Sequence, residues 1–136
     1  IMLTGDNETT AKAVAAQLGI DEVRANLMPE EKAEVVKSLK NSGKKIAFIG
    51  DGVNDSPSLA LANIGIAMGS GTDTAIETSD IVLMKSSFDE LVHAYGLSKR
   101  TVANMTQNIV IAIVVVLFLL ASLIPVSSTH PMLPTI

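Results

Sequence analysis

Charged residues are confined to the first part of this chain. All 24 Asp, Glu, Lys and Arg residues among the 136 lie between Asp6 and Arg100, and none follows. In the uncharged remainder, Met105–Ile124 supplies about the 20 residues that a helix needs to cross ~30 Å of hydrocarbon. Isoleucine, valine and leucine occur on every face of that helix, so no side remains for water. The chain is therefore predicted to be a water-soluble part followed by a transmembrane helix.

A buried helix in a soluble core is the alternative interpretation of the apolar stretch. The strictly apolar run Ile109–Ile124, interrupted only by Ser122, is shorter than the ~18 residues typical of a span. The flanking charges favour the membrane, because Lys99 and Arg100 precede the stretch and no charge follows it. Since positive charges mark the cytosolic side, we expect a cell-membrane protein with residues 1–100 in the cytosol.

These observations divide the chain into three parts. We expect a folded domain over residues 1–97, a helix entering and crossing the membrane over 98–124, and an extracytoplasmic loop or the start of a next segment over 125–136. The first residues, Ile1-Met2-Leu3, resemble the middle of a strand and carry no signal-peptide pattern, so we expect a fragment of a longer protein. The chain has no cysteine, which excludes disulfides, and its net charge of −4 argues against nucleic-acid binding.

The soluble part alternates between strand and helix patterns. Strands are expected at 1–3, 23–27, 46–49, 64–68 and 81–84, and helices at 8–18, from Pro29 to about Asn41, at 57–62, 72–78 and 88–97, with the last helix starting near Ser98. This alternation implies parallel pairing through right-handed crossovers. The fold class predicted is α/β, with a parallel, Rossmann-like sheet.

The strand expected at 46–49 ends in Gly50-Asp51-Gly52-Val53-Asn54-Asp55. Ligands of open α/β sheets bind at the carboxyl ends of the strands, and two glycines allow a sharp turn there. Asp51 and Asp55 supply the hard oxygen ligands that Mg²⁺ takes together with substrate phosphate. An ordinary Asp-Gly turn is the alternative, but the full string after an apolar strand favours a magnesium-phosphate site.

Two further groups suit a phosphate. Thr4 and Gly5 follow the first strand and offer a hydroxyl and a backbone N–H to phosphate oxygens. Lys32 lies near the start of a helix and can bring a positive charge to the same pocket. A Thr-Gly turn or a helical lysine alone is weak support, because both are common on surfaces. Together with Asp51 they supply the positioning and charge neutralisation that phosphoryl transfer needs.

In this order the motifs closely resemble those of the P-type cation-transporting ATPases, a branch of the haloacid-dehalogenase-like phosphotransferases. The matching strings are Thr-Gly-Asp-Asn at 4–7, Met-Pro-Glu-Glu-Lys at 28–32, Gly-Asp-Gly-Val-Asn-Asp-Ser-Pro-Ser-Leu-Ala at 50–60, Gly-Ile-Ala-Met-Gly at 65–69 and Glu-Thr-Ser-Asp-Ile-Val-Leu at 77–83. The heavy-metal branch is the most similar, because Leu-Ser-Lys-Arg at 97–100 leads directly into Gln107-Asn108 and the apolar run.

The resemblance implies roles for the residues at the first strand and at the lysine. Thr4 and Gly5 would bind the aspartyl phosphate during its hydrolysis, and Asp6 would lie on the nucleotide side. Lys32 would neutralise the phosphoryl oxygens. The cycle so implied uses ATP to form an aspartyl phosphate and hydrolyses it while transport helices move a transition-metal cation across the membrane.

It also implies roles for the turn after the third strand. Asp51 would coordinate Mg²⁺, Asn54 would hydrogen-bond near the phosphoryl group, and Asp55 would support the site as a second metal-side carboxylate. Ser56 and Ser58 stand where alanines are usual in the family, and because both are small we expect them to be tolerated.

The departures from the family limit what this chain does alone. The phosphorylated aspartate in Asp-Lys-Thr-Gly-Thr, the nucleotide domain and the actuator domain are absent, so we expect no ATP turnover by this piece. Copper pumps of the family usually carry a tyrosine-asparagine pair in this membrane helix, and zinc pumps often carry a lysine there. No tyrosine and no lysine follows Thr101, so the resemblance weakly favours cobalt or iron as cargo. Two alternatives stay open: a phosphatase of the same superfamily using Thr4, Lys32 and Asp51, or a non-catalytic regulator that starts at Met2 and docks on an intact pump.

Overall fold

The computed structural model describes residues 1–69, 73–85 and 87–128, and it divides into two compact units, Ile1–Leu91 and the chain from Val92 onward. The first unit begins with β1 (Met2–Leu3), α1 (Glu8–Leu18) and β2 (Val23–Arg24), and β1 pairs with β2 in parallel. Asn7 caps α1 by accepting a hydrogen bond from the Thr10 backbone N–H at 2.9 Å. Gly19 ends the helix in a left-handed conformation with a φ of 68°.

A second parallel sheet contains β3 (Ala47–Gly50), β4 (Ile64–Met68) and β5 (Ile81–Leu83) in the order β3-β4-β5. Its middle strand β4 is buried from Gly65 onward, whereas β3 is half exposed, with Ile49 37% accessible. The apolar run at 46–49 suits a strand buried inside a sheet, and the strand forms, but its burial was predicted wrongly. Strand β4 is buried because it has a neighbour on both sides, and β3 lies at an edge.

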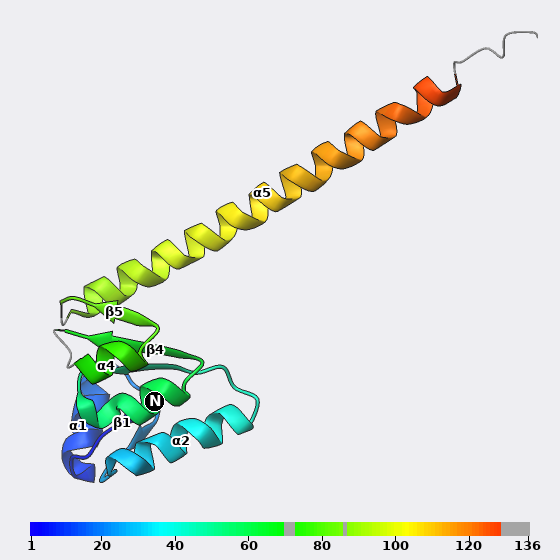
Figure 1. The fold of residues 1–136 in the computed structure, drawn as a ribbon. Coiled ribbons are helices and arrows are strands. Elements are labelled where there is room, and N and C mark those ends of the chain that lie inside the picture. Colours follow the sequence, from blue (N-terminus) through cyan, green and yellow to red (C-terminus); the bar gives the residue numbers. More distant parts are fainter. Residues whose placement is uncertain (70–72, 86, 129–136) are drawn as a thin grey trace, which may run out of the picture. The chain divides into compact units, whose positions relative to one another are not determined.

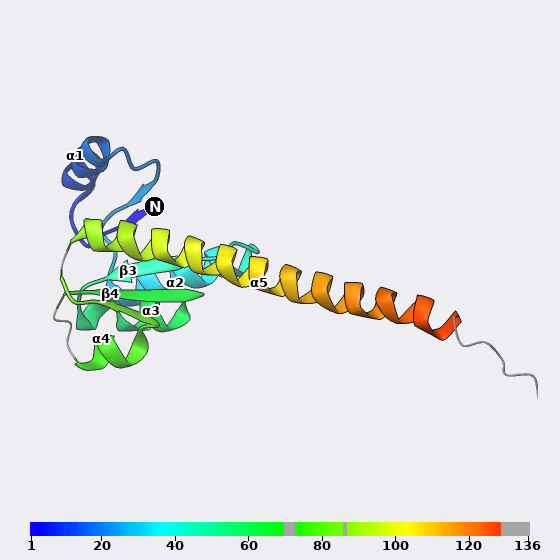
Figure 2. The ribbon, with the colours of Figure 1, turned by 90° about the horizontal axis from the view of Figure 1, so that it is seen from above.

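Helices cover one face of this second sheet. They are α2 (Pro29–Asn41), α3 (Ser56–Leu61), which follows the short 3₁₀ helix η1 (Val53–Asp55), and α4 (Asp73–Thr78). Helix α3 contacts β3 and β4, and α2 packs on α3, as Figures 1 and 2 show. The core of this layer is built on Val36, Leu59 and Ala67, which are at most 1% exposed. Helix and strand alternation with parallel pairing, as the sequence predicted, is confirmed.

The five strands form two sheets instead of one continuous sheet. Among the described residues no ladder joins β1 to β3. A pocket of about 450 Å³ is lined by the β1 residues Met2 and Leu3 on one side and by the β3 residues 47–49 on the other. Each of these strands thus has one edge without a partner strand in the described part of the chain.

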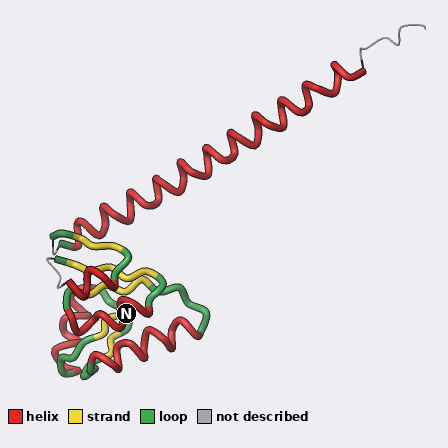
Figure 3. The backbone as a smooth tube through the Cα atoms, in the orientation of Figure 1, coloured by secondary structure: helices red, strands yellow, loops and turns green. Residues whose placement is uncertain are grey.

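The last element, α5 (Phe88–Ser128), is one uninterrupted helix of 41 residues (Figure 3). The break expected between Leu97 and Ser98 was wrong. The helix also continues past Pro125 to Ser128, and the loop or start of a next segment expected over 125–136 stays a prediction. No glycine or proline stands between Leu97 and Ile124 to stop the helix. The Thr101 hydroxyl donates a hydrogen bond to the Leu97 carbonyl at 2.9 Å. Its hydrogen-bonding need is thus met inside the helix.

Helix α5 has the length and composition of a membrane span. At ~1.5 Å per residue it is about 60 Å long, twice the ~30 Å of hydrocarbon. Among the described helices it is the one long and apolar enough to cross a membrane, and its apolar window is not buried within the protein. The exposure of every side chain over 97–124 argues against the alternative of a core helix in a soluble domain.

Two buried hydroxyls give a first prediction about stability. The Oγ atoms of Ser56 and Ser58 are buried and have no hydrogen-bond partner among the described residues, and Ser58 is 0% exposed. A buried hydroxyl without a partner costs about 1–3 kcal/mol, so Ser58→Ala should raise the free energy of unfolding by about 1 kcal/mol. Chemical denaturation followed by circular dichroism measures this change. Ser42→Ala, which removes a hydroxyl on an exposed residue that donates to the Leu39 carbonyl, is the matched control; a loss of stability in Ser58→Ala would contradict the prediction.

Candidate active site

The turn after β1 is fixed by hydrogen bonds to the turn after β2. The Leu27 N–H donates to the Thr4 carbonyl at 3.0 Å, and the Asn26 N–H donates to the Asp6 carbonyl at 2.8 Å. The Thr4 hydroxyl oxygen accepts from the Asp6 N–H at 3.1 Å. Gly5 and Asp6 are exposed. The three residues that the sequence assigns to phosphate and nucleotide thus share one rigid turn that faces solvent.

Helix α2 holds Lys32 in its first turn. Pro29 begins the helix, and the Glu31 carboxylate accepts a hydrogen bond from the Met28 backbone N–H at 2.7 Å, which caps the helix start. The buried residues Ala33 and Val36 lie on the face of α2 that packs on α3. Met-Pro-Glu-Glu-Lys therefore sets both where α2 begins and where the lysine stands.

The string after β3 forms a tight turn into η1. Asp51 follows the strand directly and is exposed, as is Asn54. The Asp55 N–H donates to the Gly52 carbonyl at 3.1 Å and closes the turn. The Asp55 side chain is only 13% exposed, in contrast to Asp51. The two aspartates of the motif therefore stand in different surroundings, one open to ligands and one enclosed.

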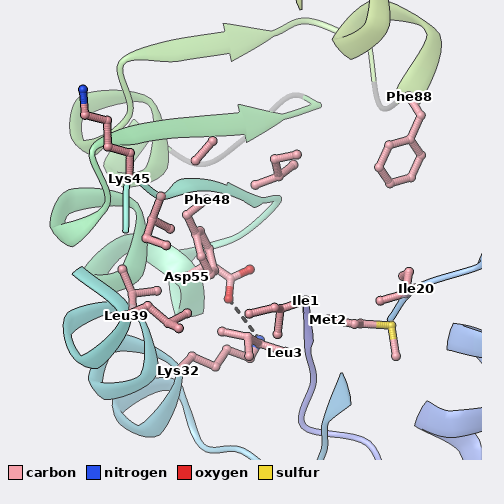
Figure 4. A pocket seen from close by; sticks show the side chains of 14 residues that line it. Ile1, Met2, Leu3, Ile20, Lys32, Leu39, Lys45, Phe48, Asp55 and Phe88 are labelled. Atoms are coloured by element: carbon pink, nitrogen blue, oxygen red, sulfur yellow. Dashed lines mark hydrogen bonds and ion pairs between the residues drawn. The ribbon is translucent and has the colours of Figure 1, made fainter. Parts of the chain in front are cut away.

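An ion pair joins α2 to this turn. The Lys32 Nζ atom lies 3.0 Å from Asp55 Oδ1, and the two side chains are 18% and 13% exposed (Figure 4). Both residues line the pocket between β1 and β3, whose other walls are mostly apolar. Because a partly desolvated pair is held in one geometry, Asp55 directs the ammonium group of Lys32 towards this pocket.

The structure brings some predicted site residues together and leaves others apart. Lys32 contacts Asp55, which follows Asp51 within one turn. No hydrogen bond or ion pair in the described part of the chain connects the Thr4–Asp6 turn to the Asp51–Asp55 turn. Thr4 and Asp51 are also not among the residues that line the pocket. A single site containing all of them stays a prediction.

The carboxylates at the end of β3 fit a magnesium ion. No group of three or more His, Asp or Glu side chains is gathered for a metal within the ranges that the structure describes. Mg²⁺ does not need one, because it usually binds through one or two carboxylates and substrate phosphates. The exposed Asp51 supplies one such carboxylate, and Asp55, enclosed and paired with Lys32, lies four residues further along the same turn.

Sequence reasoning missed two residues that shape the site. Glu31 was named only as part of the Met-Pro-Glu-Glu-Lys string, yet its carboxylate caps the start of α2. Gly50 was assigned only to turn geometry, yet a side chain there would overlap Asp55. The spacing of Glu31 after Met28 is a capping signal that the sequence carries. The contact at Gly50 depends on how η1 folds back and has no sequence signal.

Comparison with known proteins finds a matching family model and similar full-length proteins. The family model for haloacid dehalogenase-like hydrolases matches residues 1–63. Copper-transporting ATPase 2 of Rhizobium meliloti (strain 1021) is 52% identical over 108 residues, which are 79% of this chain and 13% of that protein. Copper-transporting ATPase 2 of Homo sapiens is 48% identical over 114 residues, which are 84% of this chain and 8% of that protein. This chain belongs to the P-type ATPases, in their heavy-metal branch.

Solved structures of heavy-metal P-type ATPases agree with this membership. A zinc-transporting PIB-type ATPase in its E2.Pi state matches with a TM-score of 0.81 and 44% identity, over 92% of this chain and 21% of that one. That coverage extends beyond residues 1–91, so the similarity includes residues of α5. The haloacid-dehalogenase-like fold and the apolar helix after it are thereby confirmed. This P-type ATPase chain spans less than a fifth of the length of the curated relatives it matches.

Proposed function

We propose that this chain is the carboxyl-terminal part of the phosphorylation domain, with the following transmembrane helix, of an ATP-driven transition-metal pump. The Lys32–Asp55 ion pair beside Asp51 carries the proposal, because it places a cation and a metal-binding carboxylate at one end of β3. Phosphoryl transfer requires this combination of charge neutralisation and positioning. About 50% identity to metal-transporting ATPases supports the same assignment.

Each residue at the end of β3 has a distinct task in this proposal. Asp51, supported by Asp55, would hold a Mg²⁺ ion, which would neutralise phosphate charge. Lys32 donates hydrogen bonds to the transferring phosphoryl oxygens, and Asp55 keeps its ammonium group in place. The exposed Asn54 side chain donates to the same phosphoryl group. The charge of the phosphoryl group is thus balanced from two sides.

The turn after β1 is assigned to the later half of the cycle. Thr4 and Gly5 bind the phosphoryl group during hydrolysis of the aspartyl phosphate, and Asp6 faces the nucleotide. The backbone hydrogen bonds to the turn after β2 support this role. A turn that is already rigid positions its donors without an entropy cost when the phosphoryl group binds. Gly5 also lies close to the Leu27 carbonyl, 3.3 Å from where its Cβ would stand, which favours glycine there.

The phosphorylated aspartate comes from outside this chain. The pocket between β1 and β3 is where such a residue would meet Lys32, because the Lys32 ammonium group lines it and both neighbouring strands have an open edge. The piece alone therefore lacks ATPase activity. In the full-length protein, ATP and Mg²⁺ act at this edge of the sheet, and residues 1–100 lie in the cytosol below a multi-pass membrane part.

The cargo is a transition-metal cation. Cobalt and iron are favoured by the lack of tyrosine and lysine after Thr101, but the relatives described above are named for copper and the solved structures for zinc. Copper and zinc are therefore tested first, and cobalt and iron beside them.

ATP hydrolysis by the full-length protein in membranes tests this function. The rate with Mg²⁺ should rise on adding one of Cu⁺, Zn²⁺, Co²⁺ or Fe²⁺ and stay at background with Na⁺ or Ca²⁺. A protein that hydrolyses simple phosphate esters without a response to any transition metal would be the phosphatase of the same superfamily. A protein without any hydrolysis that raises the rate of a separate pump would be the regulator.

A further inference from the structure

Gly50 stands where a side chain cannot. A Cβ atom built on Gly50 would lie 2.7 Å from Asp55 Cβ, 2.9 Å from Asp55 Oδ2 and 3.1 Å from Asp55 Cγ. Carbon atoms of residues that are not chain neighbours pack at about 3.5–4.0 Å, so an approach of 2.7 Å is a steric clash. The Asp55 side chain therefore occupies the space that any residue other than glycine would need at the end of β3.

The backbone of Gly50 does not itself call for glycine. The glycines with positive φ are Gly19, Gly43 and Gly69, and Gly50 is not among them. It pairs with Ala67 of β4 in ordinary parallel register. The requirement at this position is one of space, and the space is taken by one particular carboxylate.

Asp55 cannot yield without moving the ion pair. Its backbone N–H is bound to the Gly52 carbonyl at 3.1 Å, and its Oδ1 atom accepts from Lys32 at 3.0 Å. The closest approach to Gly50 involves the Asp55 Cβ, which a change of rotamer does not move. An added methyl group at Gly50 is thus expected to shift η1 itself and to take the carboxylate away from Lys32.

We propose that Gly50 is a positioning residue that acts through Asp55 on Lys32. Its missing side chain lets the Asp55 carboxylate lie against the end of β3, and from there the carboxylate holds the Lys32 ammonium group at the pocket. This inference rests on the proposed function only for the role of Lys32 in phosphoryl transfer. The geometric part, that Gly50 controls the Lys32–Asp55 pair, stands without it.

Lysine labelling of the full-length protein tests the geometric part. Acylation by an amine-reactive ester, quantified by mass spectrometry, compares Lys32 with the exposed Lys37 on the same helix. In Gly50→Ala the Lys32 labelling rate should rise about tenfold, the factor expected for losing one charge-assisted hydrogen bond. In the matched control Gly52→Ala, whose Cβ would meet nothing within 4 Å, it should stay unchanged. Equal labelling in both variants would overturn the inference.

A double variant separates this role from a general loss of structure. If Gly50 acts through Asp55, Gly50→Ala combined with Asp55→Asn labels Lys32 no faster than Asp55→Asn alone. Additional labelling in the double variant would contradict the proposal. Should Gly50→Ala fail to fold, Asp55→Gly with and without Gly50→Ala replaces it. No Cβ remains at position 55 in that pair, so both proteins should have the same melting temperature, and a lower one in the double variant would contradict the proposal.

Phosphoenzyme measurements on the same samples separate a failure of the proposed function from a failure of the geometric role of Gly50. If the unmodified protein forms no phosphoenzyme from ATP, the proposed function fails, while the labelling comparison still decides the geometry. If it does form one, Gly50→Ala should slow phosphoenzyme breakdown about tenfold, matching its labelling change. If Gly50→Ala labels Lys32 faster but breaks down the phosphoenzyme at the normal rate, Gly50 has only a structural role. That result would overturn the claim that Gly50 affects the reaction.

Discussion

Asp51→Asn should lower transition-metal-stimulated ATP hydrolysis of the full-length protein by a factor of about 100 to 1,000. The substitution keeps the size and shape of the side chain and removes the negative charge. Asp51 is exposed directly after β3, so the change leaves the core intact and acts on the metal-binding carboxylate. Steady-state rates over a series of Mg²⁺ concentrations measure it, and the Mg²⁺ requirement should increase together with the loss of rate.

Asp21→Asn is the matched control for this prediction. Asp21 is also exposed, but it stands before β2, at the opposite end of a strand from the site. Its substitution should leave the rate and the Mg²⁺ dependence unchanged. If Asp51→Asn behaved like Asp21→Asn, Asp51 would have no place in the reaction.

Lys32→Ala should reduce turnover by a similar factor and also lower stability. It removes the cation that balances the phosphoryl oxygens, and it leaves the Asp55 carboxylate, 13% exposed, without its partner. An unpaired carboxylate at that depth costs about 2 kcal/mol, less than the value for a fully buried pair because some water reaches it. ATP hydrolysis and the denaturation midpoint measure the two effects separately.

Lys37→Ala provides the comparison, since Lys37 is on the same helix and exposed. Its substitution should leave the rate unchanged and should change the free energy of unfolding by no more than ~0.5 kcal/mol. A Lys32→Ala protein with reduced stability and normal turnover would reduce the ion pair to a structural contact. Normal values for both would remove Lys32 from the site.

Sequence patterns located the elements whose ends carry their own signals. Helix α1 begins and ends where predicted because Asn7 and Gly19 are capping residues, and β4 has its predicted bounds because its apolar run stands alone between turns. Helix α2 follows from Pro29 in the same way. Local chemistry decides such boundaries, so a single sequence is enough to find them.

Features that depend on tertiary neighbours were not predicted. Exposure of β3 follows from its place at a sheet edge, which its apolar residues do not reveal. Helix α5 continues past Leu97 because no glycine or proline stands between Leu97 and Pro125, whereas the change from polar to apolar composition suggested two elements. The split into two sheets depends on which strands meet, and strand spacing does not encode it.

The candidate site was predicted residue by residue, but not its contacts. Lys32 and Asp55 were both assigned to it, yet they are 23 positions apart and only the fold shows that they form an ion pair. Gly50 was read for backbone freedom, whereas its structural role is to leave space for Asp55. Motifs name the chemical groups, and packing decides which of them act on each other.

Phosphoenzyme formation tests the central claim most directly. The full-length protein is incubated with γ-labelled ATP, Mg²⁺ and a transition metal, quenched in acid and examined for covalent label. The account predicts a label that hydroxylamine removes, as it does from an acyl phosphate, and that Asp51→Asn lacks. A protein that retains no label under any of these metals, or one in which Asp51→Asn is labelled as strongly as the unmodified protein, would contradict it.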